Sequence, residues 1–339
     1  MKRVLAWLFI VILLAFAGFG AWLYFGLERP YKGYQTEEQF VEIPQGAGTG
    51  SIGARLVAAG VVRDPLSFRF ELARTGTGRR LQAGEYRFDR PMTVREVVAK
   101  IARGDVYLRP ITFPEGLTIR QMSELFESKG FGPALAFVAA ASDAGPIHHL
   151  DPEARDLEGY LFPDTYALPR RTTAAQVVAR MVEGFEKVLT PELRAQAASR
   201  GLSVRELVTL ASIVEKETGN AEERPLVSAV CWNRMKTGMR LQVDPTVIYA
   251  LERAGRYTGN ITRDDLQIDS PYNTYRYAGL PPGPIAAPGR ASLEAAANPA
   301  NVPYLYFVSR NDGSHAFAST LDEHNRNVVE FQKNLNRTR

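Results

Sequence analysis

The chain has few of the residues that form covalent cross-links or metal centres. Its 339 residues include a single cysteine, Cys231, so it can form neither an intramolecular disulfide nor a CxxC metal or redox motif. The four histidines show no metal-ligand spacing. The net charge is only +4 and the basic residues form no dense run, which argues against nucleic-acid binding. We therefore expect no metal, no cofactor and no nucleic-acid partner.

One long apolar run is present, at the N-terminus. Residues 4–27 contain no charged side chain and are enough to cross a bilayer. A cleavable signal peptide is the alternative, because residues 15–17 (Ala-Phe-Ala) resemble a cleavage site. Apolar residues continue beyond that point, however, and Trp22 and Tyr24 suit a membrane interface. We favour a retained single-pass anchor with a cytoplasmic N-terminus, which places the rest of the chain outside the cytoplasm.

The chain is predicted to divide into four parts. Residues 1–27 form the cytoplasmic tip and anchor, and residues 28–39 are expected to form a polar stalk. Residues 40–108 are predicted to form a small α+β module, and residues 109–339 a larger mixed domain. That domain is expected to be rich in helices, with short strands and a C-terminal β-hairpin. The predicted fold class is therefore α+β.

The small module has the order strand, helices, strand. VEIPQG (41–46) reads as the first strand and its turn, and LQAGEYRF (81–88) as a later strand leaving a turn. The pattern resembles a LysM-like fold, which binds glycans that contain N-acetylglucosamine. A spacer without a ligand is the alternative, because a fold by itself does not specify a function.

The most informative stretch is SVRELVTLASIVEKETG, which begins at Ser203 and ends at Gly219. Ser203 and Glu206 predict a helix that starts with a capping box. Gly219 predicts that it ends in a left-handed conformation. On a helical wheel one face is apolar, and Glu215 and Glu217 fall on its flanks. Because an apolar wall raises a carboxyl pKa, this placement is typical of a helix that lines an active-site cleft.

Polar residues elsewhere are candidates for the same site. The loop LEGYLFPDTYALP (157–169) offers Glu158, Asp164 and Thr165 to border a sugar groove. The alternative is that the aromatic residues of this loop pin it to the core.

Further candidates follow the central helix. Asn233 and Arg234 lie near the end of the next predicted helix. MRLQV (239–243) predicts a short strand that carries Gln242. Asp244 then precedes a proline, so we interpret it as the N-cap of a third helix in preference to a catalyst.

The two glutamates of the central helix cannot act as a facing pair. Glu215 and Glu217 are two residues apart and diverge by about 200° around the helix axis. Ser212 lacks the GxSxG context of a serine hydrolase. Carboxyl acid–base chemistry remains, and glycosidic cleavage is its common reaction. Either a partner carboxylate lies elsewhere in the chain, or the mechanism needs only one acid. The helical wheel does not show which of the two glutamates would be the catalyst.

Several long motifs together resemble the MltG (YceG-like) family of endolytic murein transglycosylases, over essentially the whole chain. They are EGYLFPDTY (158–166), ASIVEKET (211–218), EER (222–224), NRMKTGMRLQVDPTVIY (233–249), YNTY (272–275), GLPPGPIAAPG (279–289) and PYLYFV (303–308). The resemblance implies a single-pass enzyme of the bacterial inner membrane that cuts peptidoglycan glycan strands internally. The family's catalytic glutamate corresponds to Glu217.

The resemblance also implies a mechanism with one carboxyl group. Glu217 would protonate the bond between N-acetylmuramic acid and N-acetylglucosamine, and then deprotonate the muramic C6 hydroxyl, leaving a 1,6-anhydro end. From residue type and motif, Gln242, Tyr272 and Asn273 are candidates for positioning the sugar. The supporting residues would be Glu215, Asn233, Arg234 and Asp244.

The implied partners are peptidoglycan glycan strands, the inner membrane and peptidoglycan synthases (penicillin-binding proteins). Two alternatives stay open. One is a hydrolysing muramidase that uses an additional carboxylate, Glu158 or Glu223. The other is a membrane-anchored glycan-binding scaffold without catalysis.

Overall fold

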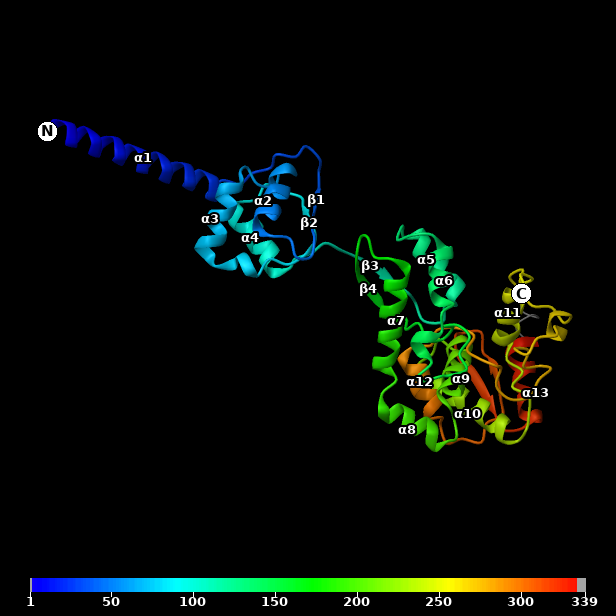
Figure 1. The fold of residues 1–339 in the computed structure, drawn as a ribbon. Coiled ribbons are helices and arrows are strands. Elements are labelled where there is room, and N and C mark those ends of the chain that lie inside the picture. Colours follow the sequence, from blue (N-terminus) through cyan, green and yellow to red (C-terminus); the bar gives the residue numbers. More distant parts are fainter. Residues whose placement is uncertain (1, 334–339) are drawn as a thin grey trace. The chain divides into compact units, whose positions relative to one another are not determined.

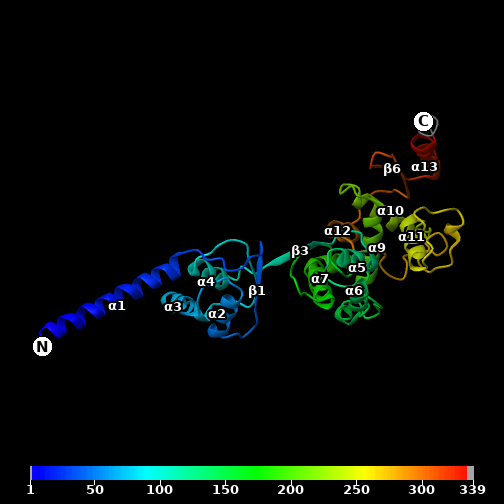
Figure 2. The same ribbon diagram turned by 90° about the horizontal axis from the view of Figure 1, so that it is seen from above.

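A computed structural model of the chain describes residues 2–333 (Figures 1 and 2). It divides into two compact units, Met1–Arg109 with Ala167–Arg171, and Pro110–Tyr166 with Thr172–Arg339. Most of the described residues that have regular structure are helical, and the strands pair in twos as β1–β2, β3–β4 and β5–β6. The fold is therefore mixed α+β, with helices predominant.

The first unit packs two strands and three short helices around one apolar core. The antiparallel strands β1 and β2 pair with Val41 opposite Tyr86, and Tyr86, Leu56 and Phe68 are fully buried. The elements are α1 (Lys2–Glu28), β1 (Gln39–Ile43), α2 (Thr49–Ala58), α3 (Pro65–Thr75), the 3₁₀ segment η1 (Thr77–Arg79), β2 (Gly84–Phe88) and α4 (Val94–Arg103).

The helix α1 has the length and composition of a membrane span. Its segment Trp7–Glu28 has a mean hydropathy of 2.3, which is compatible with a single-pass anchor. The last turn of α1 belongs to the first unit, because Leu27 is buried in its core and Glu28 pairs with Arg95 at 2.8 Å.

The segment expected to be a stalk, residues 28–39, is bound to the first unit. The Tyr31 N–H donates to the Met92 carbonyl at 2.9 Å, and the Gly33 N–H donates to the Gly60 carbonyl at 2.8 Å. The polar composition of this segment predicted a short stalk. It could not show these main-chain bonds, which connect residues far apart in the sequence.

The second unit is built mainly from helices. The strands β3 (Leu108–Thr112) and β4 (Thr165–Pro169) pair with each other, and the boundary between the two units falls within them. The other elements are α5 (Ile119–Ser128), α6 (Ala134–Ala141), η2 (Gly145–Ile147), α7 (Ala174–Val188), α8 (Pro191–Ser199), α9 (Val204–Glu217), α10 (Arg224–Lys236), α11 (Asp244–Arg253), η3 (Asp265–Gln267), α12 (Arg290–Ala297), β5 (Tyr306–Ser309), β6 (His315–Ala318), α13 (Leu321–Val328) and the π-helical η4 (Val329–Lys333).

The helix α9 is the predicted central helix, and it is buried on all sides. Its capping box is confirmed: the Ser203 hydroxyl accepts from the Glu206 N–H at 3.2 Å, and the Glu206 carboxylate accepts from the Ser203 N–H at 2.8 Å. Every residue from Leu207 to Val214 is buried, because α9 packs against α8, α10, α11 and α12. The prediction of one buried face was too narrow, since a helix enclosed by neighbours buries its whole circumference.

The predicted end of α9 is wrong. Thr218 ends the helix in an extended conformation, with φ −142°, and Gly219 is absent from the described residues that have positive φ. The hydroxyl of Thr218 instead bonds to Glu223 at 3.3 Å. A side-chain contact beyond the helix therefore fixes this end, in place of a left-handed glycine.

The predicted strand over residues 239–243 is also wrong. Gln242 has a φ of +51°, which breaks extended geometry, and its N–H donates to the Thr274 carbonyl at 3.2 Å. The Val243 N–H donates to the Thr274 hydroxyl at 3.1 Å. Asp244 is not a side-chain cap of α11, because its carboxylate accepts a hydrogen bond from the Tyr275 hydroxyl at 2.5 Å. These bonds to residues 274 and 275 replace both predicted local structures.

Candidate active site at the end of helix α9

The last turn of α9 carries Glu215, whose carboxylate holds neighbouring helices together. One oxygen accepts from the Gly289 N–H at 2.9 Å and from the Ser292 hydroxyl at 2.8 Å, at the start of α12. The other oxygen forms an ion pair with Arg224 at 3.3 Å. Glu215 therefore binds the N–H of the N-cap residue Gly289, where a negative charge is favourable at a helix N-terminus, and joins α9 to α10 and α12. The adjacent Lys216 donates to the Gly116 carbonyl at 3.1 Å.

Glu217, the residue after Lys216, differs from Glu215 in its bonding. The residue as a whole is partly exposed, and within residues 2–333 its carboxylate has neither a hydrogen-bond nor an ion-pair partner. Burial raises its pKa to about 8; the negative charge of Asp244 acts in the same direction, and Arg234 opposes it. Glu217 is therefore largely protonated at neutral pH and can donate its proton to a bound ligand.

Asn233 and Arg234 organise the irregular segments around Glu217. The Asn233 amide donates to the carbonyls of residues 302 and 304, at 2.8 and 2.9 Å. The Arg234 guanidinium donates to the carbonyls of Leu241 and Leu305, each at 2.6 Å, and lies over the Tyr306 ring at 5.2 Å. Asn233 thus ties the segment 302–304 to α10. Arg234 additionally brings a positive charge that favours the ionised form of Glu217.

Gln242 is exposed and has an unusual backbone. It lies between the buried residues Leu241 and Val243, and its φ of +51° is rare outside glycine. Among the described residues its side-chain amide has no hydrogen-bond partner. Strained residues with free polar groups are frequent at functional sites, so Gln242 is a candidate ligand contact.

Asn273, which the sequence offered as a sugar contact, is fully buried. Its amide donates at 2.9 Å to both the Leu266 and Ile268 carbonyls, and its oxygen accepts from the Tyr275 N–H at 2.9 Å. Because both amide hydrogens are engaged within the loop, Asn273 fixes the segment that carries Tyr272 and Tyr275.

Glu158 and Tyr272 come together in a cavity of about 640 Å³. Glu158 is buried there and accepts from the Ile119 N–H at 3.0 Å and from the Tyr249 hydroxyl at 3.2 Å. Burial raises its pKa to about 8. Glu217 is not among the described residues that line this cavity, so the candidate residues divide between two places.

Asp164 and Thr165 lie in neither place. Both are exposed at the start of β4, where the Asp164 carboxylate accepts from the Thr165 N–H at 2.7 Å. The Thr165 hydroxyl bonds to that of Thr112 on β3 at 2.8 Å. Their bonds stabilise this strand pair. The sequence grouped them with Glu158 because they share one loop.

Glu223 forms a compact cluster next to the end of α9. It bonds to the His315 ring at 2.7 Å, to the His315 N–H at 2.9 Å and to the Thr218 hydroxyl at 3.3 Å. Burial by itself would raise its pKa, but the bonds from His315 hold the pKa below its ordinary value. Glu223 therefore braces the residue that follows Glu217. The sequence did not point to His315, because nothing local connects two residues 92 positions apart.

Comparison with known proteins identifies the family. The model of the YceG-like family matches residues 41–330. The chain belongs to the YceG-like family. This YceG-like protein is 32% identical over 301 residues to an endolytic murein transglycosylase of Bacillus subtilis, an alignment that covers 84% of the chain and 82% of that relative.

Two further relatives agree with this assignment. An endolytic murein transglycosylase of Streptococcus pneumoniae (D39) is 32% identical over 320 residues, which cover 86% of this YceG-like protein and 58% of the longer relative. The crystal structure of a putative yceG-like protein from Listeria monocytogenes has a TM-score of 0.59 at 31% identity, covering 86% of this chain and 99% of that one.

Proposed function

We propose that this YceG-like protein is an endolytic lytic transglycosylase that cleaves peptidoglycan between N-acetylmuramic acid and N-acetylglucosamine. The relatives named endolytic murein transglycosylases support the reaction class. The assignment of the catalyst rests on the protonation and bonding of Glu217. It is a protonated carboxyl group, without a bonding partner among the described residues, at the end of a largely buried helix, while both oxygens of the nearby Glu215 are engaged.

In the first step Glu217 acts as a general acid. Its proton passes to the glycosidic oxygen while the bond from that oxygen to C1 of the muramic sugar breaks, and positive charge develops at C1 and the ring oxygen. The carboxylate left on Glu217 is stabilised by the positive charge of Arg234.

In the second step the same residue acts as a base. The Glu217 carboxylate takes the proton of the muramic C6 hydroxyl, and O6 closes onto C1 to give the 1,6-anhydro product. Neither water nor a second carboxyl group takes part, which fits the engagement of Asp244, Glu215 and Glu223 in bonds of their own. Asp244 bonds to Tyr275 and raises the pKa of Glu217, so it supports the acid step.

The other parts of the molecule fit an enzyme that acts on a polymer near a membrane. We infer that α1 anchors the chain in the inner membrane by a single pass, with the catalytic unit outside the cytoplasm. The first unit, with its LysM-like pattern, would bind the glycan strand. Gln242 would contact the sugar, and peptidoglycan synthases would supply nascent strands.

The test is the substitution Glu217→Gln, with Glu222→Gln as the matched control. Glu222 is an exposed acid five residues further on, beyond the end of α9. We expect Glu217→Gln to lower glycan cleavage by about 10³-fold or more with the fold intact, and Glu222→Gln to leave it unchanged. Unchanged cleavage by a folded Glu217→Gln protein contradicts the assignment of the catalyst.

The product distinguishes the proposed reaction from hydrolysis. Mass spectrometry of digested glycan should find 1,6-anhydro-muramic ends. Reducing-end muramic acid would instead show a muramidase and point to a second carboxylate, with Glu158 the better candidate because Glu223 is engaged by three donors. Binding without any cleavage would indicate a scaffold.

A further inference from the structure

The cavity around Glu158 is a second concave site that the reaction at Glu217 does not use. Its volume of about 640 Å³ lies within the range of about 300–1,000 Å³ that is usual for ligand pockets. Its walls come from the loop 151–160, the end of α11, the loop 268–272 and the proline-rich residues 282–284.

Three guanidinium groups line the cavity, and two of them have no carboxylate partner within residues 2–333. Arg205 forms an ion pair with Asp151 at 2.9 Å. Arg253, by contrast, donates only to the Tyr249 hydroxyl, at 3.3 Å, among the bonds of the described residues. Arg155 is exposed and forms neither a hydrogen bond nor an ion pair within residues 2–333.

Most of the acidic side chains that line the cavity are either paired with an arginine or uncharged. Asp151 pairs with Arg205, and Asp269 pairs with Arg276 at 3.6 Å. Glu158 is neutral in most molecules at pH 7, because burial raises its pKa to about 8. Asp156 remains, and its carboxylate accepts the Glu158 N–H at 3.0 Å. Counted over the described part of the chain, the cavity has two unpaired guanidinium groups against one unpaired carboxylate, so it favours an anion.

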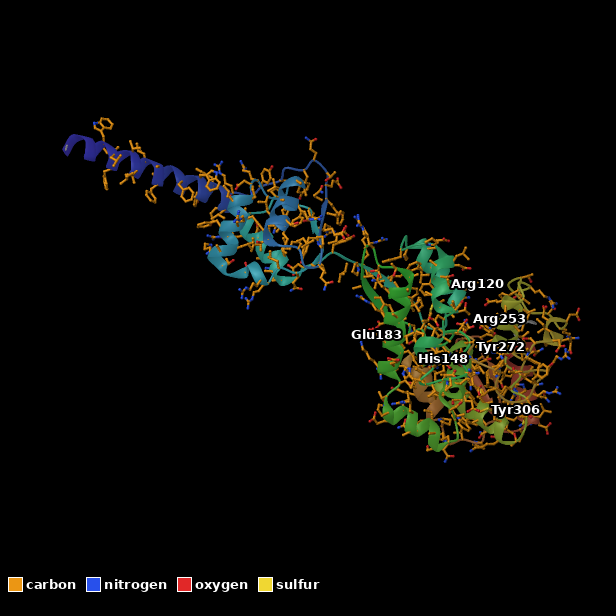
Figure 3. The ribbon with its side chains drawn as sticks, in the orientation of Figure 1. Arg120, His148, Glu183, Arg253, Tyr272 and Tyr306 are labelled. Carbon is orange, nitrogen blue, oxygen red and sulfur yellow. The ribbon has the colours of Figure 1, made fainter. Side chains whose placement is uncertain are left out.

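An aromatic surface adjoins these positive charges. The rings of Tyr249 and Tyr272 lie 4.9 Å apart, and the Arg253 guanidinium lies 5.7 and 5.5 Å from their centres. Figure 3 labels Arg253 and Tyr272 in the second unit. Tyr272 is partly exposed. A planar ring beside a guanidinium suits a ligand in which a carboxylate is attached to an apolar or amide-containing group.

The cavity is close enough to Glu217 for one polymer to reach both. The helix α11 begins at Asp244, near Glu217, and ends at Arg253, and these residues are about 14 Å apart along the axis. Tyr272 and Tyr275 are separated by at most about 11 Å of extended chain. A strand cleaved at Glu217 can therefore present a neighbouring substituent to the cavity.

We propose, building on the proposed function, that this cavity binds a carboxylate of the peptide attached to the glycan strand. Arg253 and Arg155 pair with the carboxylate, and Tyr272 packs against the adjoining part of the peptide. Glu158 supplies a buried hydrogen-bonding group at the floor of the cavity. The enzyme then distinguishes peptide-bearing glycan from glycan without peptides.

The experiment measures binding in a protein that does not cut its ligand. In the Glu217→Gln background, the affinity is measured for a soluble peptide-bearing glycan oligomer and for the same oligomer after its peptides are removed. We expect R155A/R253A to weaken binding of the peptide-bearing oligomer by about 10- to 100-fold and that of the peptide-free oligomer by less than about 3-fold. Arg256→Ala, an exposed arginine that does not line the cavity, is the control and should change neither.

A second measurement needs no change to the cavity. Converting the peptide carboxylates to amides should weaken binding to the protein with Arg155 and Arg253 intact by a similar factor, and should have no further effect on R155A/R253A. Equal losses for both oligomers, or no loss on amidation, would overturn the proposal. Failure of the proposed function is read separately, from the wild-type cleavage products, so the two outcomes are distinguishable.

Discussion

At the scale of single residues, the last turn of α9 contains residues that hold the fold together and, within three positions, the candidate catalytic residue. Glu215 bonds to the start of α12 and to Arg224, and Lys216 bonds to a carbonyl. The carboxyl group of Glu217 has no bonding partner in the described part of the chain, and burial raises its pKa to about 8. A rigid helix end with one free acid is a suitable arrangement for proton transfer, because the surrounding bonds fix its position without neutralising it.

The pKa of Glu217 predicts how stability depends on pH. Its ordinary value is 4.5 and its folded value about 8, so between these values the folded state binds the proton more tightly than the unfolded state does. The contribution of Glu217 protonation to the free energy of unfolding is fully present below about pH 4.5 and is lost as pH rises through about 8. Glu217→Gln removes this loss, so we expect it to be more stable than wild type at pH 9 by about 1–3 kcal/mol, and nearly equal at pH 4.5.

Urea unfolding at both pH values checks this expectation. Glu158 titrates over the same range but is present in both proteins, so its effect cancels in the difference. The same ionisation should lower kcat/KM of wild type above about pH 8, because the general acid is lost. A stability difference that does not change with pH would show that Glu217 has an ordinary pKa.

At the scale of elements, the loop that carries Glu158 is held against α9 by a close backbone approach at Gly159. Gly159 has a φ of +83°, and a Cβ there would lie 2.4 Å from the Pro284 side chain and 2.9 Å from that of Val208. Gly279 has the same φ of +83°, but apart from its two chain neighbours no described residue has an atom within 4 Å of such a Cβ. Comparing alanine substitutions at the two positions therefore distinguishes the cost of backbone strain from the cost of steric overlap.

We expect Gly159→Ala to destabilise the protein by about 3–5 kcal/mol and Gly279→Ala by about 1–2 kcal/mol. The extra loss at position 159 reflects the overlap with Pro284 and Val208, which belong to different segments of the second unit. Chemical denaturation of both variants measures the two values. Equal losses would mean that the loop moves away from α9 without difficulty.

At the scale of the whole molecule, the apolar helix is continuous with the first folded unit. Leu27 is buried in the core of that unit, and Glu28 pairs with Arg95. The helix α1 therefore ends inside a packed structure, and main-chain bonds from residues 31 and 33 tie the following segment to that structure.

Two truncations test this continuity. A protein that lacks residues 1–25 retains Leu27 and Glu28, whereas one that lacks residues 1–30 loses both, and neither should associate with membranes. We expect the longer deletion to lower the stability of the first unit by about 2–3 kcal/mol relative to the shorter one, mainly through the lost burial of Leu27. Hydrogen exchange in α4 reports that stability, and equal protection in both proteins would contradict a structural role for Leu27.

The sequence by itself determined the features that depend on neighbours in the chain. The apolar run of α1, the capping box of Ser203 and Glu206, and the helical character of α9 all follow from residues within a few positions of one another. The motifs also led to the YceG-like family, which the comparisons confirm. Both glutamates at the end of α9 could be named as candidates, because helical periodicity fixes their direction.

Only the tertiary structure decided how these residues divide their roles. Glu215 is engaged because α12 begins beside it, and Gln242 has positive φ in a segment that bonds to Thr274. The cavity likewise joins Glu158, Arg253 and Tyr272, from three separate parts of the chain. Burial, pairing and the resulting pKa values depend on contacts between distant segments, and no local pattern records those contacts.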